Sequence, residues 1–180
     1  KHTPGNTVSN LSSSRALKDV TEAYGQQYHA AAVGEVNVVA EMKRTHSVIG
    51  GEGNGGVIYP ESHYGRDALV GVGLFLSHYV AQSKKMTELK STYPPYFISK
   101  NKMTLSPDMD VDKILEGLKE RYATEKVTDI DGVKIDFAQG WVHLRKSNTE
   151  PIIRIYSEAK DEAAANQLAE EVIAAAKSTF

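Results

Sequence analysis

The sequence predicts an α/β domain followed by a smaller α+β domain, and two observations carry this prediction. Short apolar strands alternate with amphipathic helices over residues 1 to about 90, which indicates a three-layer α/β/α arrangement. After the run Tyr93-Pro94-Pro95-Tyr96 the pattern becomes helix, four strands, helix, which favours a four-stranded antiparallel sheet with two helices. We therefore expect an α/β domain at 1–92, a linker at 93–106 and an α+β domain at 107–180.

The elements of the first domain have local signals. Three serines at 12–14 precede apolar residues that follow one helical face over 16–24, and Gly25 ends this helix. The helix predicted from Arg66 to about Ser83 is apolar nearly all round, so we expect it to be buried. The remaining pattern predicts a helix at 36–44 and strands at 7–9, 28–33, 47–49 and 57–59.

The second domain has a regular pattern from its first helix onward. The apolar residues of this helix share one face, and they are Val111, Ile114, Leu115, Leu118 and Tyr122. Asp131-Gly132 between two apolar runs is a strong hairpin signal. Strands at 141–145 and 152–156 follow, and Asp161 begins a last amphipathic helix. Both helices would cover an antiparallel sheet.

The composition excludes several classes of protein. The 180 residues carry 21 Lys and Arg against 23 Asp and Glu, so a nucleic-acid-binding protein that relies on positive charge is not expected. The absence of cysteine excludes disulfides and thiolate sites, and it favours a reducing, cytoplasmic location. No segment has the ~18–20 apolar residues that a membrane span needs. Because the chain begins without Met or a signal peptide, we expect it to be a piece of a longer polypeptide.

A glycine-rich segment at 51–56 is the first candidate site. It matches G-x-G-x-x-G, but a strand follows it where a dinucleotide fingerprint needs a helix, and no kinase motif follows either. The segment offers one carboxylate, Glu52, and one amide, Asn54, which together suit vicinal sugar hydroxyls. The alternative interpretation is a flexible, glycine-rich connector.

The acidic run Asp108–Asp112 resembles a metal loop only superficially. An EF-hand would need Gly at its sixth position and Glu at its twelfth, where this sequence has Lys113 and Lys119. These acids precede a helix, whose positive end favours negative charge. We therefore expect a helix start here and no metal site in this chain.

The segment from Arg145 to Arg154 is the second candidate site and the more informative one. It joins two apolar strands and gathers arginines, a lysine, two hydroxyls and an amide. Arginine binds phosphate through a planar fork, and Ser, Thr and Asn add neutral donors. A polar hairpin turn with solvated charges is the alternative.

These two segments together resemble the α-D-phosphohexomutase family. Gly51-Glu52-Gly53-Asn54-Gly55 resembles the family's sugar-binding loop, usually G-E-x-S-G, although Asn54 stands where many relatives have Ser. The second segment resembles the family's phosphate-binding loop, R-x-S-x-T-E-P-x-x-R. Order and separation also match, so the chain is similar to most of the family's third domain and its complete fourth domain. The residues that the resemblance assigns to substrate binding are Glu52, Gly53, Asn54, Arg145, Ser147, Asn148, Thr149 and Arg154, with Glu35 as a further, weaker candidate after Gly34.

The resemblance implies a reaction for the full-length protein. Hexose 1-phosphate and hexose 6-phosphate would interconvert through a phosphoserine and a bisphosphorylated sugar, with Mg²⁺ held by an upstream domain and sugar bisphosphate as activator. No catalytic residue would lie in this chain, whose partners would be a hexose phosphate and the upstream domains. A phosphosugar-binding module without chemistry, and a purely structural pair of domains, are the alternatives. The hexose is left open among glucose, mannose and glucosamine.

Overall fold

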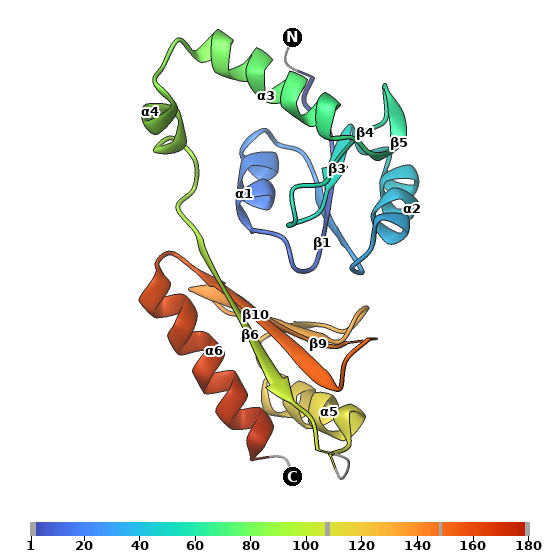
Figure 1. Cartoon of the computed structure of the whole chain (residues 1–180), viewed down its shortest axis with the longest axis vertical. Helices are drawn as coiled ribbons and strands as arrows, with labels where there is room; N and C mark the ends of the chain where they lie inside the picture. Colours follow the sequence, from blue (N-terminus) through green and yellow to red (C-terminus); the bar gives the residue numbers. More distant parts are fainter. Residues whose placement is uncertain (1–2, 107–108, 148, 179–180) are drawn as a thin grey trace. The chain divides into compact units, whose positions relative to one another are not determined.

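The computed structural model describes residues 3–106, 109–147 and 149–178. The chain divides into two compact units, Lys1–Pro95 and Tyr96–Phe180 (Figure 1). Each unit has its own sheet and its own hydrophobic core. No helix in the described ranges is long and apolar enough to cross a membrane.

The first unit is built on a mixed sheet with the strand order β2-β1-β3-β4-β5. β1 pairs in parallel with β2 and β3, whereas β3–β4 and β4–β5 are antiparallel. The strands are β1 Thr7–Asn10, β2 Tyr28–Ala31, β3 Ile49–Gly51, β4 Val57–Tyr59 and β5 His63–Arg66. The helices are α1 Ala16–Ala23, α2 Glu35–Thr45, α3 Ala68–Gln82 and α4 Met86–Lys90.

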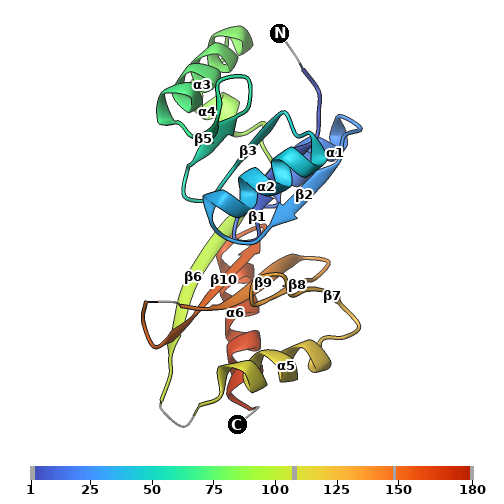
Figure 2. The same cartoon turned by 90° about the vertical axis from the view of Figure 1, so that its right-hand side faces the viewer.

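Helices α1 and α2 cover opposite faces of this sheet (Figures 1 and 2). The alternation of side chains along β1 separates the two contacts. Val8 packs in the core with Val38 and Met42 of α2. Its neighbour Thr7 is hydrogen-bonded through Oγ1 to Thr21 Oγ1 of α1, at 2.7 Å. The α/β/α layering predicted from the sequence is therefore present.

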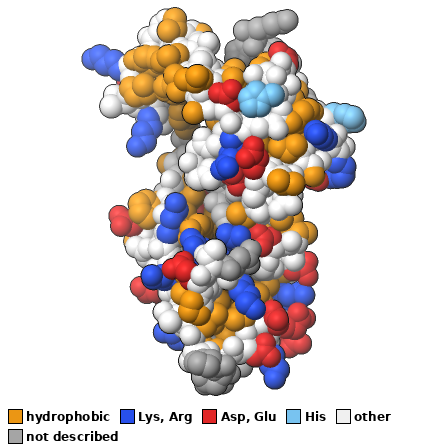
Figure 3. Space-filling view, turned by 45° about the vertical axis from the view of Figure 1, so that its right-hand side comes forward, with side chains coloured by type: hydrophobic (Ala, Val, Ile, Leu, Met, Phe, Trp, Pro, Cys, Tyr) orange, Lys and Arg blue, Asp and Glu red, His pale blue; other side chains and the backbone are white. Residues whose placement is uncertain are grey.

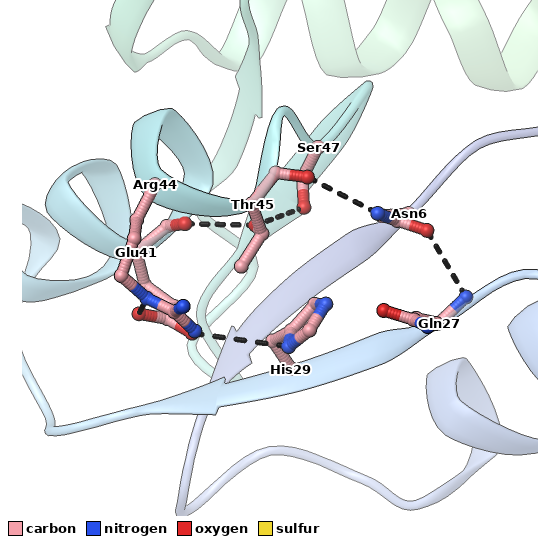
Figure 4. A network of polar contacts seen from close by, with 7 residues as sticks. All are labelled: Asn6, Gln27, His29, Glu41, Arg44, Thr45 and Ser47. Atoms are coloured by element: carbon pink, nitrogen blue, oxygen red, sulfur yellow. Dashed lines mark hydrogen bonds and ion pairs between the residues drawn. The ribbon is translucent and has the colours of Figure 1, made fainter.

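A polar network at the start of β1 ties the strands to the end of α2 (Figure 4). Asn6 Nδ2 donates to the Thr45 carbonyl at 3.1 Å, while Asn6 Oδ1 accepts from the Gln27 amide at 3.1 Å. The Thr45 hydroxyl lies 2.7 Å from that of Ser47. These bonds satisfy polar groups where two strands and a helix end meet.

Two expectations for the region around α3 are corrected. Arg66 ends an unpredicted strand, β5, and the helix begins only at Ala68 after Asp67, whose carboxylate accepts from the Val70 amide. No residue of α3 is buried, although the helix contains no charged residue. Leu69 is 83% exposed and Val80 is 74% exposed, and hydrophobic side chains gather over this helix (Figure 3). The composition of a helix records its preference for burial but not whether another element is there to cover it.

The second unit is an antiparallel sheet with the order β6-β10-β9-β8-β7, covered on one face by α5 and α6. The core between them contains apolar residues of β8, β9, β10 and both helices. The strands are β6 Phe97–Thr104, β7 Lys126–Thr128, β8 Val133–Asp136, β9 Gly140–Lys146 and β10 Ile152–Ala159, and the helices are α5 Val111–Arg121 and α6 Glu162–Lys177. The predicted hairpin at Asp131-Gly132 is present between β7 and β8.

The sheet of this unit has a fifth strand that the sequence did not predict. β6 lies within residues 93–106, the segment expected to be a linker, and pairs with β10 from Phe97 to Thr104. Of its eight residues only Ser99 and Met103 are buried, so the apolar alternation that signals a strand is too sparse to detect. Pairing with β10 decides its conformation instead.

Candidate functional site

The glycine-rich loop between β3 and β4 is a closed turn rather than an open connector. The Glu52 amide donates to the Gly56 carbonyl at 2.9 Å, and the Gly55 amide donates to the Glu52 carbonyl at 3.0 Å. Asn54 Oδ1 accepts from the Gly56 amide at 3.0 Å, so this side chain helps to shape the loop. Asn54 itself is exposed.

Close packing explains two of the loop's glycines. A Cβ on Gly53 would lie 2.9 Å from the Ser12 carbonyl oxygen, and a Cβ on Gly56 would lie 2.5 Å from Cδ of Arg66. Real Cβ atoms do not approach other atoms so closely. These glycines therefore allow the loop to lie against the turn after β1 and against β5.

Glu52 differs from the exposed loop carboxylate that the sequence suggested. Its side chain is only 5% exposed. Oε1 accepts a hydrogen bond from Asn10 Nδ2 at 3.1 Å, and Oε2 lies 3.1 Å from Arg66 Nη1. The carboxylate is thus held in place before any ligand binds, and it keeps acceptor capacity because each oxygen has two lone pairs.

Glu35 lies at the start of α2 and also contacts Arg66. Its Oε1 accepts from the Arg66 backbone amide at 2.8 Å and its Oε2 from Arg66 Nε at 2.9 Å. These two hydrogen bonds hold the pKa of Glu35 below its ordinary value. One guanidinium therefore joins both acidic candidates of the first unit, Glu35 and Glu52.

Sequence reasoning did not single out Arg66. It lies 31 positions from Glu35 and 14 from Glu52, and no local motif links the three. The only sequence signal was a lone arginine near the expected start of a helix, where such a residue is common. The pairing of β4 with β5, in which Ile58 lies opposite Arg66, carries Arg66 back to the loop.

The second candidate segment forms the turn between β9 and β10. The Ser147 amide donates to the Ile152 carbonyl at 3.0 Å, which closes the turn. The Ser147 hydroxyl lies 3.4 Å from that of Thr149 and accepts from the Thr149 amide at 3.5 Å. Ser147 is buried and Thr149 is exposed. The remaining predicted member of the turn, Asn148, lies outside the described residues.

Strand register brings the predicted arginines of this segment together. Arg145 of β9 and Arg154 of β10 are direct cross-strand partners, so they share one face of the sheet. Lys146 belongs to the opposite face by the alternation of side chains. On its other side, Arg154 is paired with Lys102 of β6, which sequence reasoning missed because β6 was not predicted. We call Lys102, Arg154 and Arg145 the basic row.

Carboxylates pair with two of the three cations of the basic row. Arg154 Nη2 lies 3.1 Å from Glu150 Oε2, and Arg145 Nε lies 3.8 Å from Asp131 Oδ2. Like charges directly opposite one another on neighbouring strands are destabilising. An anion bound over the row would relieve this repulsion, and arginine favours a bidentate oxyanion.

A neutral histidine lies next to this row. His143 is 2% exposed, and Nε2 is 2.7 Å from the Asp131 carbonyl oxygen. Burial, together with the positive charges of Lys134 and Arg145, lowers the pKa of His143 to about 4 even though the carbonyl opposes this shift. His143 is thus uncharged at neutral pH and adds no cation to the row.

The acidic run before α5 serves the helix. Asp110 accepts hydrogen bonds from the amides of Asp112 and Lys113 at 3.1 and 3.2 Å, as an N-cap does. Asp108 lies outside the described residues. Among the residues that the structure does describe, no group of three His, Asp or Glu side chains could hold a metal ion. The Mg²⁺ that the resemblance implies was expected in an upstream domain, and that site stays a prediction.

Comparisons with known proteins match both parts of the chain to one family. Residues 1–96 match the family model of the phosphoglucomutase/phosphomannomutase alpha/beta/alpha domain III, and residues 100–175 match that of the C-terminal domain. A phosphoglucosamine/phosphogalactosamine mutase of Sulfurisphaera tokodaii is 36% identical over 92% of this chain and 37% of its own length. A phosphoglucomutase/phosphomannomutase of Thermococcus kodakarensis is also 36% identical, over 92% of this chain and 36% of its length.

Solved structures share the fold. A phosphoglucomutase/phosphomannomutase family protein of Burkholderia thailandensis superimposes with a TM-score of 0.78 at 22% identity, over 98% of this chain and 38% of that one. An N-acetylphosphoglucosamine mutase of Aspergillus fumigatus, solved with GlcNAc-6P and magnesium, gives 0.61 at 15% identity, over 96% of this chain and 41% of that one. The chain thus spans little more than a third of these relatives. Because two consecutive domain models cover most of its residues, it belongs to the phosphoglucomutase/phosphomannomutase family of α-D-phosphohexomutases, of which it contains domains III and IV.

Proposed function

We propose that this chain is the substrate-holding half of a phosphohexomutase. The first unit would hold sugar hydroxyls through Glu52, Gly53 and Asn54, and the second would hold the non-reacting phosphate. In the second unit the phosphate ligands would be Arg145, Ser147, Asn148, Thr149 and Arg154. The full-length enzyme would interconvert hexose 1-phosphate and 6-phosphate through a phosphoserine and a bisphosphorylated sugar.

One observation supports the phosphate assignment above the others. Arg145 and Arg154, which are nine positions apart in the sequence, are direct partners in the ladder beside the Ser147–Thr149 turn. Although each guanidinium lies near a carboxylate, placing two like charges directly opposite each other on neighbouring strands costs free energy. A dianionic phosphate would offset that cost.

The chemistry itself would need parts of the protein that this chain does not contain. The first unit supplies a buried, pre-positioned carboxylate, and the second supplies cations and hydroxyl donors. Mg²⁺ would be held by an upstream domain of the full-length protein, as the resemblance to the family implies. Relatives whose names include glucosamine, glucose and mannose leave the hexose open.

Titration of the ¹⁵N-labelled chain by NMR tests the binding proposal. Inorganic phosphate should shift the amides around 145–154, and glucose 6-phosphate, mannose 6-phosphate or glucosamine 6-phosphate should also shift those at 51–56. Glucose without phosphate is the control for the first unit. If no sugar phosphate shifts either region, the chain is not the substrate-holding half.

We expect the chain alone to have no mutase activity, since no residue in it is assigned to phosphoryl transfer. A coupled assay of glucose 6-phosphate formation from glucose 1-phosphate measures this directly. Turnover by the purified chain that survives removal of contaminating mutase would contradict the proposed division of labour.

A further inference from the structure

We propose that Arg66 is a positioning residue for sugar recognition, because it clamps the Glu52 carboxylate to Glu35. This inference rests on the proposed function and extends it to a residue that neither loop motif includes. Arg66 itself need not touch the sugar. Its role would be to fix where the hydroxyl acceptor Glu52 lies.

Arg66 contacts both Glu35 and Glu52, through its guanidinium and its backbone amide. Nε donates to Glu35 Oε2 at 2.9 Å, and Nη1 lies 3.1 Å from Glu52 Oε2. The Arg66 backbone amide adds a bond to Glu35 Oε1 at 2.8 Å. Glu35 thus holds Arg66 through one bond to its backbone amide and one to its guanidinium, and the guanidinium in turn holds Glu52.

Charge compensation makes this clamp more than a surface ion pair. Exposed ion pairs contribute little to stability, but the Glu52 side chain is only 5% exposed. Its second partner, Asn10, is neutral. Without Arg66, the Glu52 carboxylate would be buried with no opposite charge, which is strongly unfavourable. It would turn outward to water and leave its position.

The packing of the loop gives independent support. Gly56 leaves the space that Cδ of Arg66 occupies, since a Cβ there would lie 2.5 Å away. The glycine-rich loop is therefore shaped around the arginine as well as bonded to it. Gly56→Ala should displace Arg66, whereas Gly73→Ala on α3 is a matched control, because a Cβ at that position would meet nothing within 4 Å.

The test compares Arg66→Ala with Arg66→Lys and with a matched ion-pair control. Arg44→Ala removes an exposed arginine of the same unit, which donates to Glu41 at 2.6 and 2.8 Å. The measured quantity is the preference of the ¹⁵N-labelled chain for glucosamine 6-phosphate over inorganic phosphate. We expect Arg66→Ala to reduce this preference at least tenfold, Arg66→Lys to reduce it less, and Arg44→Ala to leave it unchanged. Affinity for inorganic phosphate should stay constant in all of them.

A ligand-free measurement in the same spectra separates the clamp from the sugar role. The side-chain amide signals of Asn10, which donates to Glu52, should shift in Arg66→Ala and in Gly56→Ala but not in the two controls. If those signals stay in place, or if Arg66→Ala keeps the full sugar-phosphate preference, the inference is overturned. A wild-type chain with no preference for the sugar phosphate would instead refute sugar binding itself, while the Asn10 signals would still decide whether the clamp exists.

Discussion

The two candidate loops treat charge in opposite ways. In the first unit the carboxylate of Glu52 is buried and forms an ion pair with Arg66. In the second unit the cations of the basic row lie opposite one another, and carboxylates pair with two of the three. The first loop is thus electrostatically complete without ligand, whereas the second would gain stability from an anion. These two arrangements suit the ligands proposed for them, a neutral polyol at the first loop and a phosphate at the second.

Different contacts stabilise the two sites. The glycine-rich loop depends on close backbone packing against β5 and the turn after β1. The turn between β9 and β10 depends on strand register within one sheet, and the buried, neutral His143 lies in the same strand as Arg145.

Acid should destabilise the second unit more than the first. Burial lowers the pKa of His143 from 6.5 to about 4, so the unfolded chain takes up this proton at a higher pH than the folded chain does. The stabilisation is complete above pH 6.5 and is lost as the pH falls toward 4, by roughly 3 kcal/mol in total.

Urea unfolding at several pH values, followed through Trp141 of the second unit, measures this slope. His143→Gln should remove most of it, because glutamine does not titrate. A slope that is the same in wild type and His143→Gln would show that other groups cause the acid sensitivity.

Glu52→Ala should abolish the distinction between a sugar phosphate and inorganic phosphate. Loss of a charged acceptor for hydroxyls costs roughly 1.5–3 kcal/mol, which is about ten- to hundredfold in affinity. Affinity for inorganic phosphate should not change, since the basic row is untouched. Calorimetric titration with both ligands checks the prediction, and an equal loss for both would remove Glu52 from sugar recognition.

Arg145→Lys should weaken phosphate binding more than Lys146→Ala. Lysine keeps the charge of Arg145 but loses its two parallel N–H groups, whereas Lys146 is exposed on the opposite face of β9. Loss of a charge-assisted hydrogen bond costs about 1.5–3 kcal/mol, and removal of a solvated charge costs less. Phosphate affinities over a salt series decide the ranking. If Lys146→Ala loses more phosphate affinity than Arg145→Lys at moderate salt, the segment is a basic turn without a shaped phosphate site.

Arg154→Gln should change stability and binding in opposite directions. Removing the central cation of the basic row relieves repulsion from the cations on both neighbouring strands, which is worth roughly 0.2–1 kcal/mol of stability at low salt. The loss of the exposed Arg154–Glu150 ion pair subtracts from this gain. Phosphate affinity should nevertheless fall. Thermal unfolding without and with phosphate measures both effects. A variant that loses stability and keeps its phosphate affinity would make Arg154 a structural residue.

The local elements and the two loops follow from short stretches of the sequence. Capping by Asp110 and Asp161, the Asp131-Gly132 hairpin and the apolar faces of α5 and α6 are encoded by residues at most a few positions apart. The motif around Ser147 and Thr149 is local in the same sense. Short-range spacing is sufficient for such features because backbone geometry converts it directly into a shared face or a turn.

Contacts between distant parts of the chain set how these elements meet. β6 became a strand because β10 pairs with it, and that pairing alone added Lys102 to the basic row. Arg66 met Glu35 and Glu52 through the pairing of β4 with β5, and α3 remained exposed despite its wholly uncharged sequence. These contacts join residues that lie far apart in the chain, where their free energy depends on register and burial rather than on any pattern that neighbouring residues display.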